Sequence, residues 1–313
     1  MRTIAVFLAL AIFAAPGCRK LPGKHSRPDF GGKPVRVFAT TGMIADAARA
    51  VGGQHVEVDC LMGPGVDPHR YVPSPNDLVR IKNAHLTLYN GLHLEGKMTD
   101  IFEVRAQNTW TVAVAEDLPD LRAAEEGFEG TKDPHVWFDV RMWMKVVEKV
   151  RDTLCDIDPP HTDTYQANAS TYLRQLESLD NEVRLKLSKV PESRRVLITA
   201  HDAFGYFGRA YGFEVRGLQG VSTAGDTSGR DVQDLADLIG TRKIKAVFTE
   251  TSVPDKGMRA VQEAVRSKYK GFMVRVAEDQ LYSDALGEPG TPGETYVGMV
   301  RHNVDAMVRA LGD

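Results

Sequence analysis

Residues 162–190, TDTYQANASTYLRQLESLDNEVRLKLSKV, contain neither glycine nor proline and predict one long helix. Apolar residues recur through the stretch at the spacing of a helix face, namely Tyr165, Ala169, Tyr172, Leu173, Leu176, Leu179, Val183 and Leu187. At 1.5 Å per residue, such a helix would be roughly 40 Å long. We therefore expect a rigid linking helix, assigned to residues 161–190, that joins two parts of the chain.

On each side of this helix, apolar runs alternate with helical patterns. In the first half the expected strands are 35–40, 56–62, 86–90 and 111–115, and the expected helices are 44–51, 76–83 and 95–106. In the second half the expected strands are 196–200, 214–218, 246–249 and 273–276, and the expected helices are 203–211, 231–239, 257–267 and 296–311. This alternation predicts an α/β fold in which each half forms a lobe with a parallel sheet flanked by helices. The lobes are assigned to residues 35–160 and 191–313.

The N-terminus has the features of a secretory signal. Arg2 supplies one positive charge before an apolar stretch, Ile4 to Ala15, that is too short to span a bilayer. Residues 15–18, Ala-Pro-Gly-Cys, resemble a lipobox, the bacterial signal whose cysteine is lipid-modified, although Ala15 stands where a larger aliphatic residue is usual. We expect a signal peptide at 1–17 and a lipidated tether at 18–34, anchored through Cys18 at the outer face of the cytoplasmic membrane or in the periplasm. Simple secretion after cleavage is the alternative.

Charge and cysteine content argue against a nucleic-acid-binding protein and against a protein built on disulfides or a CxxC motif. The net charge is -3, with acidic and basic residues interspersed, so we expect no nucleic-acid partner. Beyond Cys18 only Cys60 and Cys155 remain, too few for a disulfide framework and not spaced as a CxxC motif. We expect two buried free thiols, with a bridge between them as the alternative.

Two copies of Asp-Pro-His, at residues 67–69 and 133–135, indicate a metal site built from distant loops. Imidazole is a common ligand of transition metals, and the neighbouring proline restricts the backbone beside each histidine. A third histidine, His201, directly follows the apolar run 196–200. Since ligands of open parallel sheets bind beyond the carboxyl ends of strands, two facing sheets could share one metal in the cleft between the lobes.

Five motifs follow one another over nearly the whole mature chain: GPGVDPH at 63–69, YNGLHLE at 89–95, DPHVW at 133–137, TAHDAFGYF at 199–207 and SDALG at 283–287. Together they resemble the TroA-like metal-binding lipoproteins, which serve manganese and zinc ABC importers. The resemblance implies two βα lobes joined by a single long helix. It also implies a buried ion held by His69, His135, His201 and Asp284, and a monomer that delivers the ion to an ABC transporter permease.

Other polar residues near the expected cleft are assigned supporting roles. His93 and Glu95 follow the third strand, and in the family this segment supports the site without binding the ion. Glu250 ends an apolar strand that faces the same cleft, and we expect it to hydrogen-bond a metal-binding histidine. Direct ligation in competition with Asp284 is the alternative. The glycine-rich residues 217–229 are expected to form a mobile loop near the cleft.

The metal itself is predicted from two cues that conflict. In the family a histidine as third ligand, here His201, is typical of zinc or mixed zinc and manganese proteins. Zinc-dedicated members often carry a His-rich acidic loop before the second Asp-Pro-His, whereas residues 116–132 are acidic without histidine. The expected cargo is therefore Zn2+ or Mn2+, with a zinc-only importer second and iron third. A zinc hydrolase is a remote alternative, because the chain has no His-Glu-x-x-His motif and no nucleophile elbow, and we expect no enzyme.

Overall fold

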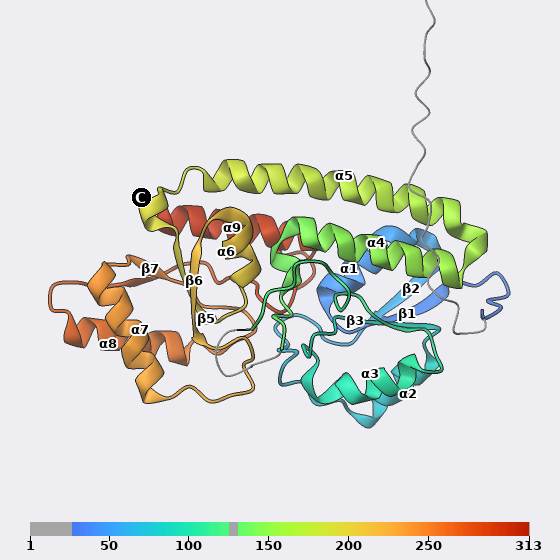
Figure 1. Ribbon diagram of the computed structural model, residues 1–313, viewed down its shortest axis with the longest axis horizontal. Helices are drawn as coiled ribbons and strands as arrows, with labels where there is room; N and C mark the ends of the chain where they lie inside the picture. The colour runs from blue at the N-terminus through green and yellow to red at the C-terminus, as the bar shows by residue number, and fades with distance from the viewer. Residues whose placement is uncertain (1–26, 125–130, 313) are drawn as a thin grey trace, which may run out of the picture.

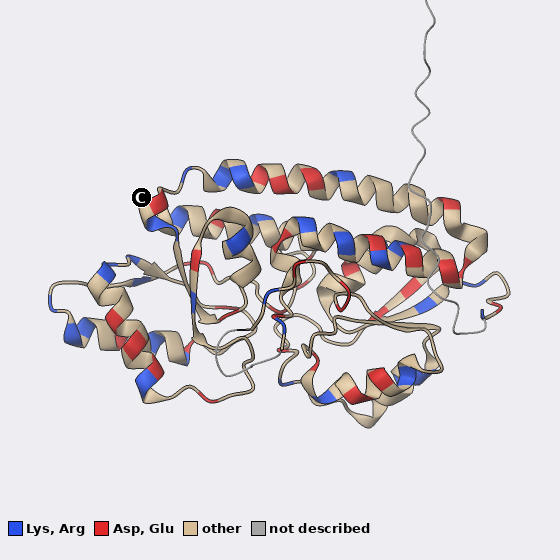
Figure 2. Cartoon of the chain, viewed as in Figure 1, with Lys and Arg blue, Asp and Glu red and all other residues tan. Residues whose placement is uncertain are grey.

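The computed structural model describes residues 27–124 and 131–312, which form two lobes with long helices along one side of both (Figure 1). The predicted signal peptide at 1–17, Cys18 and the tether up to residue 26 lie outside the described residues. Within the described ranges, no helix combines the length and the apolar character needed to cross a membrane. Basic and acidic residues both occur along the long helices on the outside of the lobes (Figure 2).

The first lobe is built on a four-stranded parallel sheet in the order β2-β1-β3-β4. Its strands are β1 (Val35–Ala39), β2 (Val56–Cys60), β3 (Leu86–Tyr89) and β4 (Thr111–Ala113). Its connecting helices are α1 (Gly42–Gly52), α2 (Pro75–Asn83) and α3 (Thr99–Ala106). Helix α1 lies on one side of the sheet and α2 and α3 on the other (Figure 1), and β3 is buried along its whole length. Burial on both faces is the expected state of a parallel strand covered by helices.

The second lobe repeats the alternation of strands and helices with two longer and two very short strands. Its strands form two parallel pairs, β5 (Val196–His201) with β6 (Glu214–Gln219) and β7 (Ala246–Val247) with β8 (Arg275–Val276). The N–H of Phe248 donates to the C=O of Ile198 at 2.8 Å, which places β7 beside β5. Its helices are α6 (Gly205–Tyr211), α7 (Gly229–Arg242), α8 (Lys256–Lys268) and α9 (Tyr296–Leu311).

The predicted long helix is present as α5, Thr162–Leu187, and passes over both lobes (Figure 1). Apart from the half-buried Leu173, all the residues of its predicted apolar face are buried. The helix ends three residues before the predicted position. There the N–H groups of Lys189 and Val190 bond three residues back, a tighter turn that closes the helix ahead of Pro191.

Two further helices accompany α5, and the sequence analysis missed one of them. Helix α4, Val140–Ile157, begins at Asp139, whose carboxylate accepts from the backbone N–H groups of Arg141 and Met142. Helix α9 starts against α4, where Tyr296 stacks on Trp143 with ring centroids 5.2 Å apart. The largest hydrophobic cluster therefore includes residues of both lobes and runs across the proposed boundaries at residues 160 and 190, beside a smaller cluster within each lobe.

Three local predictions need correction. The strands predicted at 246–249 and 273–276 are shorter than expected, Ala246–Val247 and Arg275–Val276. The helix predicted at 95–106 begins only at Thr99, because Leu92 and His93 have positive φ angles of 55° and 61° and the chain then makes a 3-10 turn. Of the cysteines in the described ranges, Cys60 and Cys155 are free thiols, but Cys60 is only half-buried.

Candidate metal centre

The structure brings the four candidate metal ligands together between the lobes. Each offers a ligand atom, and these atoms all lie within 4.8 Å of one another. His69 follows β2, His135 precedes α4, His201 is the last residue of β5, and Asp284 lies between β8 and α9. None of the four is more than 5% exposed. Both lobes thus contribute to one buried cluster.

Each Asp-Pro-His triplet forms the same turn. The Oδ1 atom of Asp67 accepts a hydrogen bond from the N–H of His69 at 2.9 Å, and Oδ1 of Asp133 accepts one from the N–H of His135 at 3.0 Å. Such a side-chain bond to the backbone two residues later is an Asx turn, and the intervening proline fixes φ within it. The aspartate therefore shapes the turn that presents the histidine.

The facing atoms of the cluster suit a divalent cation. The Nε2 atoms of His69 and His135 are 3.2 Å apart, and Nε2 of His201 is 3.2 Å from Oδ2 of Asp284. Within residues 27–124 and 131–312, the carboxylate oxygens of Asp284 and Nε2 of His201 make no hydrogen bond and have only ion-pair contacts with one another and with the other two histidines. Buried polar atoms left in this way are costly. Three imidazoles and one carboxylate are donors that a transition metal would satisfy.

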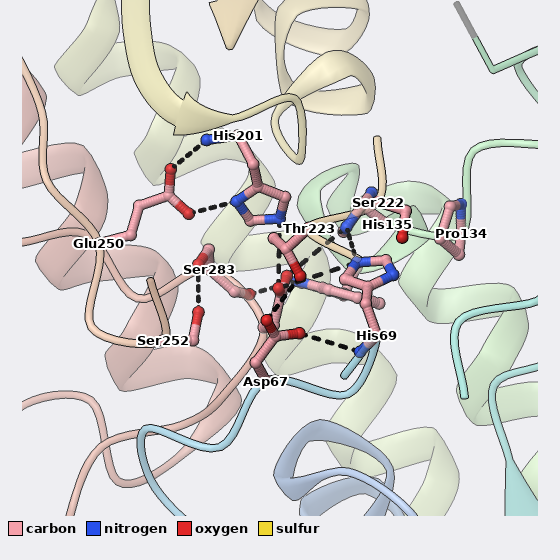
Figure 3. A network of polar contacts seen from close by, with 12 residues as sticks. Asp67, His69, Pro134, His135, His201, Ser222, Thr223, Glu250, Ser252 and Ser283 are labelled. Atoms are coloured by element: carbon pink, nitrogen blue, oxygen red, sulfur yellow. Dashed lines mark hydrogen bonds and ion pairs between the residues drawn. The ribbon is translucent and has the colours of Figure 1, made fainter. Parts of the chain in front are cut away.

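Carboxylates behind two of the imidazoles set their orientation, and Figure 3 shows one of these pairs, His201 with Glu250. Nδ1 of His201 lies 2.6 Å from Oε2 of Glu250, whose Oε1 accepts from the backbone N–H groups of Ala200 and His201 at 2.7 and 3.0 Å. Nδ1 of His135 lies 2.8 Å from Oδ1 of Asp133. A carboxylate at Nδ1 keeps the proton there and leaves Nε2 free for a metal. The predicted hydrogen bond between Glu250 and a candidate ligand is present, with the carboxylate as acceptor, whereas the role of Asp133 was missed.

The ionisation of the cluster is uneven. Burial lowers the pKa of His69 to about 3, and the attraction of Asp284 offsets only part of that effect. Burial also acts to lower the pKa of His201, but the carboxylates Asp284 and Glu250 outweigh it and raise that pKa well above its usual value. Burial acts to raise the pKa of Asp284, but the imidazoles, His201 foremost, hold it well below its usual range. At neutral pH a metal would meet a neutral His69 and a proton to displace from His201.

The family described as "Zinc-uptake complex component A periplasmic", ZnuA, matches residues 37–310. The chain belongs to the ZnuA family. Its similarity to the manganese-binding lipoprotein MntA of Bacillus subtilis (strain 168) is 46% identity over 301 residues, or 96% of each chain. Its similarity to the zinc-binding protein TroA of Treponema pallidum (strain Nichols) is 48% identity over 281 residues, or 90% of this chain and 89% of TroA.

Structural comparison of this ZnuA-family chain agrees with the sequence comparison. The solved structure of the periplasmic zinc-binding protein TroA from Treponema pallidum matches with a TM-score of 0.85 over 90% of this chain and 99% of TroA. The iron-binding protein YfeA of Yersinia pestis is more distant, at 28% identity over 312 residues, or 100% of this chain and 97% of YfeA. The predicted resemblance and the predicted α/β fold are confirmed.

Two residues of the ZnuA-family motif at 89–95 lie outside the cluster. His93 is exposed. Glu95 is buried, which raises its pKa, and it accepts from Thr40 Oγ1 at 2.7 Å and from the N–H of Asn90 at 2.6 Å. Nδ2 of Asn90 in turn donates to the C=O of Pro134 at 3.1 Å. Glu95 thus holds the loop that supports the His135 turn.

The glycine-rich stretch predicted as a loop at 217–229 is partly a strand. Its first three residues complete β6, because they pair with the end of β5. Farther along, Thr223 is 2% exposed and its Oγ1 donates to Oδ2 of Asp67 at 2.5 Å (Figure 3). This contact with the first lobe joins sequence positions 156 residues apart, and no local pattern predicts it.

Proposed function

We propose that this chain is the metal-binding subunit of an ABC importer. It would capture a divalent transition metal outside the cytoplasmic membrane and deliver it to a permease. The single observation that supports this function best is the buried convergence of three imidazoles and one carboxylate from both lobes. Membership in a family named for zinc uptake supports the same function.

We propose His69, His135, His201 and Asp284 as the metal ligands. One carboxylate and three neutral imidazoles would leave a bound divalent ion with a net charge near +1. The carboxylates of Asp133 and Glu250 would hydrogen-bond two of the histidines from behind. The four donors leave no position assigned to a reactive water, which favours a binding protein over the zinc hydrolase alternative.

The proposed cargo is manganese or zinc. MntA is named for manganese, TroA for zinc and the more distant YfeA for iron, so the names of relatives support a class of metals and not one member. Zinc binds a given site of nitrogen and oxygen donors more tightly than manganese does, so affinity alone would not identify the cargo. A zinc-only importer is the second candidate, supported by the third histidine, His201.

Metal analysis tests this proposal. The mature chain would be purified without added metal, its metal content measured, and zinc and manganese titrated against a competing chelator. We expect one ion per chain, and at least a tenfold loss of affinity in His135→Ala. His93→Ala, which removes an exposed histidine, should bind like the parent. Absence of stoichiometric binding by the parent would overturn the function.

We also propose that Cys18 carries a lipid anchor and that residues 18–34 tether the monomeric lobes beside the permease. The name of MntA as a lipoprotein supports this reading. A lipobox cysteine carries at least two acyl chains, enough for stable attachment. Cys18→Ser should leave the membrane fraction with its metal affinity unchanged. Retention of an exported Cys18→Ser protein in that fraction would contradict the anchor.

A further inference from the structure

Arg122 lies on the segment before the His135 turn and reaches into the second lobe. The backbone N–H of Arg122 donates to Oη of Tyr206 at 3.0 Å, and Nη1 of its guanidinium donates to the C=O of Gly205 at 2.9 Å. Oη of Tyr206 donates in turn to the C=O of Asp133 at 2.9 Å. Arg122 therefore connects the start of α6 with the aspartate that orients His135.

The same arginine balances a buried charge. Asp133 is fully buried, and its Oδ1 is occupied by the N–H and Nδ1 of His135. Its Oδ2 has no hydrogen bond to any residue that the structure describes, but Nε of Arg122 lies 3.4 Å away as an ion-pair partner. A buried carboxylate without a compensating cation or donor is strongly unfavourable.

The two histidine–carboxylate pairs are thus supported differently. Glu250, behind His201, is held by backbone N–H groups of Ala200 and His201 at the end of β5. Those donors belong to the same lobe and the same strand as the histidine. Asp133, behind His135, depends on a side chain that is itself fastened to the other lobe. The orientation of His135 is therefore sensitive to the contact between the lobes.

We propose that Arg122 is a positioning residue for the metal site, holding Asp133 as the hydrogen-bond acceptor of His135 and tying that histidine to the second lobe. The proposal rests on the proposed function, in which His135 binds the ion. Without the guanidinium, the Asp133 carboxylate turns toward other donors and releases Nδ1 of His135. The imidazole then loses the orientation and the tautomer that expose Nε2.

Gly205 offers a second way to disturb the arginine. A Cβ built on Gly205 would lie 2.6 Å from Nη2 of Arg122, so glycine here makes room for the guanidinium. Gly205→Ala should displace the arginine without removing any charge or any polar atom. Because the clashing atoms end a flexible side chain, we expect the lobe itself to stay folded.

Arg209 provides a matched control. Its guanidinium carbon lies 4.9 Å from the centroid of the Tyr206 ring, over which Arg122 also lies, at 5.9 Å. It donates to the C=O of Asp120 and to Sδ of Met142 and pairs with Asp139 at 3.9 Å, and none of these residues belongs to the metal cluster. Arg209→Met therefore removes a cation from the same neighbourhood while leaving Asp133 its partner.

The test compares zinc affinity by chelator competition and the absorption spectrum of the cobalt-loaded protein. Arg122→Met should lose roughly ten- to 100-fold in affinity and change the cobalt spectrum, because His135 is no longer oriented. Arg122→Lys should recover part of the loss, since it keeps the charge without the planar fork. Gly205→Ala should show a smaller loss with a similar spectral change, and Arg209→Met should bind within about twofold of the parent.

Parent-like affinity and spectrum in Arg122→Met would overturn the proposal, as would an equal loss in Arg209→Met. If Arg122→Met does not fold, as judged by circular dichroism, Gly205→Ala becomes the deciding variant. A parent-like cobalt spectrum and zinc affinity of Gly205→Ala would then contradict the proposed role of Arg122. All of these outcomes leave zinc binding by the parent intact. Failure of the proposed function would appear instead as absence of binding by the parent itself.

Discussion

Replacing Glu250 by glutamine would show whether the histidine tautomer controls metal binding. Three N–H groups converge on this carboxylate: the backbone groups of Ala200 and His201 on Oε1, and Nδ1–H of His201 on Oε2 at 2.6 Å. Glutamine has one acceptor oxygen and one NH2 donor. With its oxygen on the backbone groups, its NH2 faces Nδ1, which must then give up its proton. The neutral imidazole of His201 then carries its proton on Nε2, the atom that faces Asp284 and that would bind the metal.

The size of the effect follows from the supporting role of Glu250. Loss of a carboxylate behind a metal-binding histidine typically costs ten- to 100-fold in affinity, or about 1.4–2.8 kcal/mol. A second effect has the opposite sign. Glu250 helps to raise the pKa of His201, so its removal lowers the number of protons that a metal must displace. The difference in zinc affinity between the parent and Glu250→Gln should therefore become smaller as the pH falls.

The assay is zinc competition against a chromophoric chelator at about pH 8 and about pH 6. Glu263→Gln, an exposed glutamate paired with Arg266 on α8, is the matched control and should behave as the parent. We expect the full loss for Glu250→Gln at the higher pH and a smaller one at the lower pH. Parent-like zinc affinity of Glu250→Gln at both values would refute the reasoning about tautomers.

Three other predictions address the charge and the geometry of the site. The pKa of His201 is higher in the folded protein than in the unfolded chain, so protonated His201 stabilises the metal-free fold fully below the unfolded pKa, and this stabilisation is lost as the pH rises through the folded pKa. Zinc should therefore raise the melting temperature, measured by calorimetry, more at about pH 8 than at about pH 6. Asp284→Asn should lose at least tenfold in zinc affinity, since it removes the only carboxylate among the proposed ligands. Asp279→Asn, at a half-buried position paired with Arg309, should not; equal affinities of the two variants would exclude Asp284 as a ligand. Thr223→Val should release zinc several-fold faster than Thr223→Ser in stopped-flow measurements, because only serine keeps the hydroxyl that bonds Asp67 across the lobes; equal rates would show that this contact does not hold the site.

Much of the fold could be predicted from local pattern. Within the described residues, the alternation of apolar runs and helical patterns located all eight strands and seven of the eight α-helices other than α5, closely enough to identify two βα lobes. The absence of glycine and proline identified α5 itself. Helix α4 was missed, although Val140, Trp143, Val147 and Leu154 recur at helical spacing and are buried. The charged residues between them make the segment amphipathic, so a helical signal was present in the sequence and was overlooked.

The candidate site was predictable in part, for reasons that differ between its residues. The Asp-Pro-His repeat points to His69 and His135, and the strand end points to His201. Asp284 has no such local signal and was named only through the family motif. Contacts such as that of Thr223 with Asp67 could not be predicted from the sequence, because they join loops of different lobes and depend on how the folded lobes pack.

The most direct test of the account is anomalous diffraction from crystals of the zinc-loaded protein, recorded on both sides of the zinc absorption edge. The account predicts one zinc peak per chain, bound by Nε2 of His69, His135 and His201 and by the carboxylate of Asp284, at distances of about 2.0–2.2 Å. A peak held by other residues, or one in which a water replaces Asp284, would contradict the claim that the two lobes enclose the ion with these four side chains.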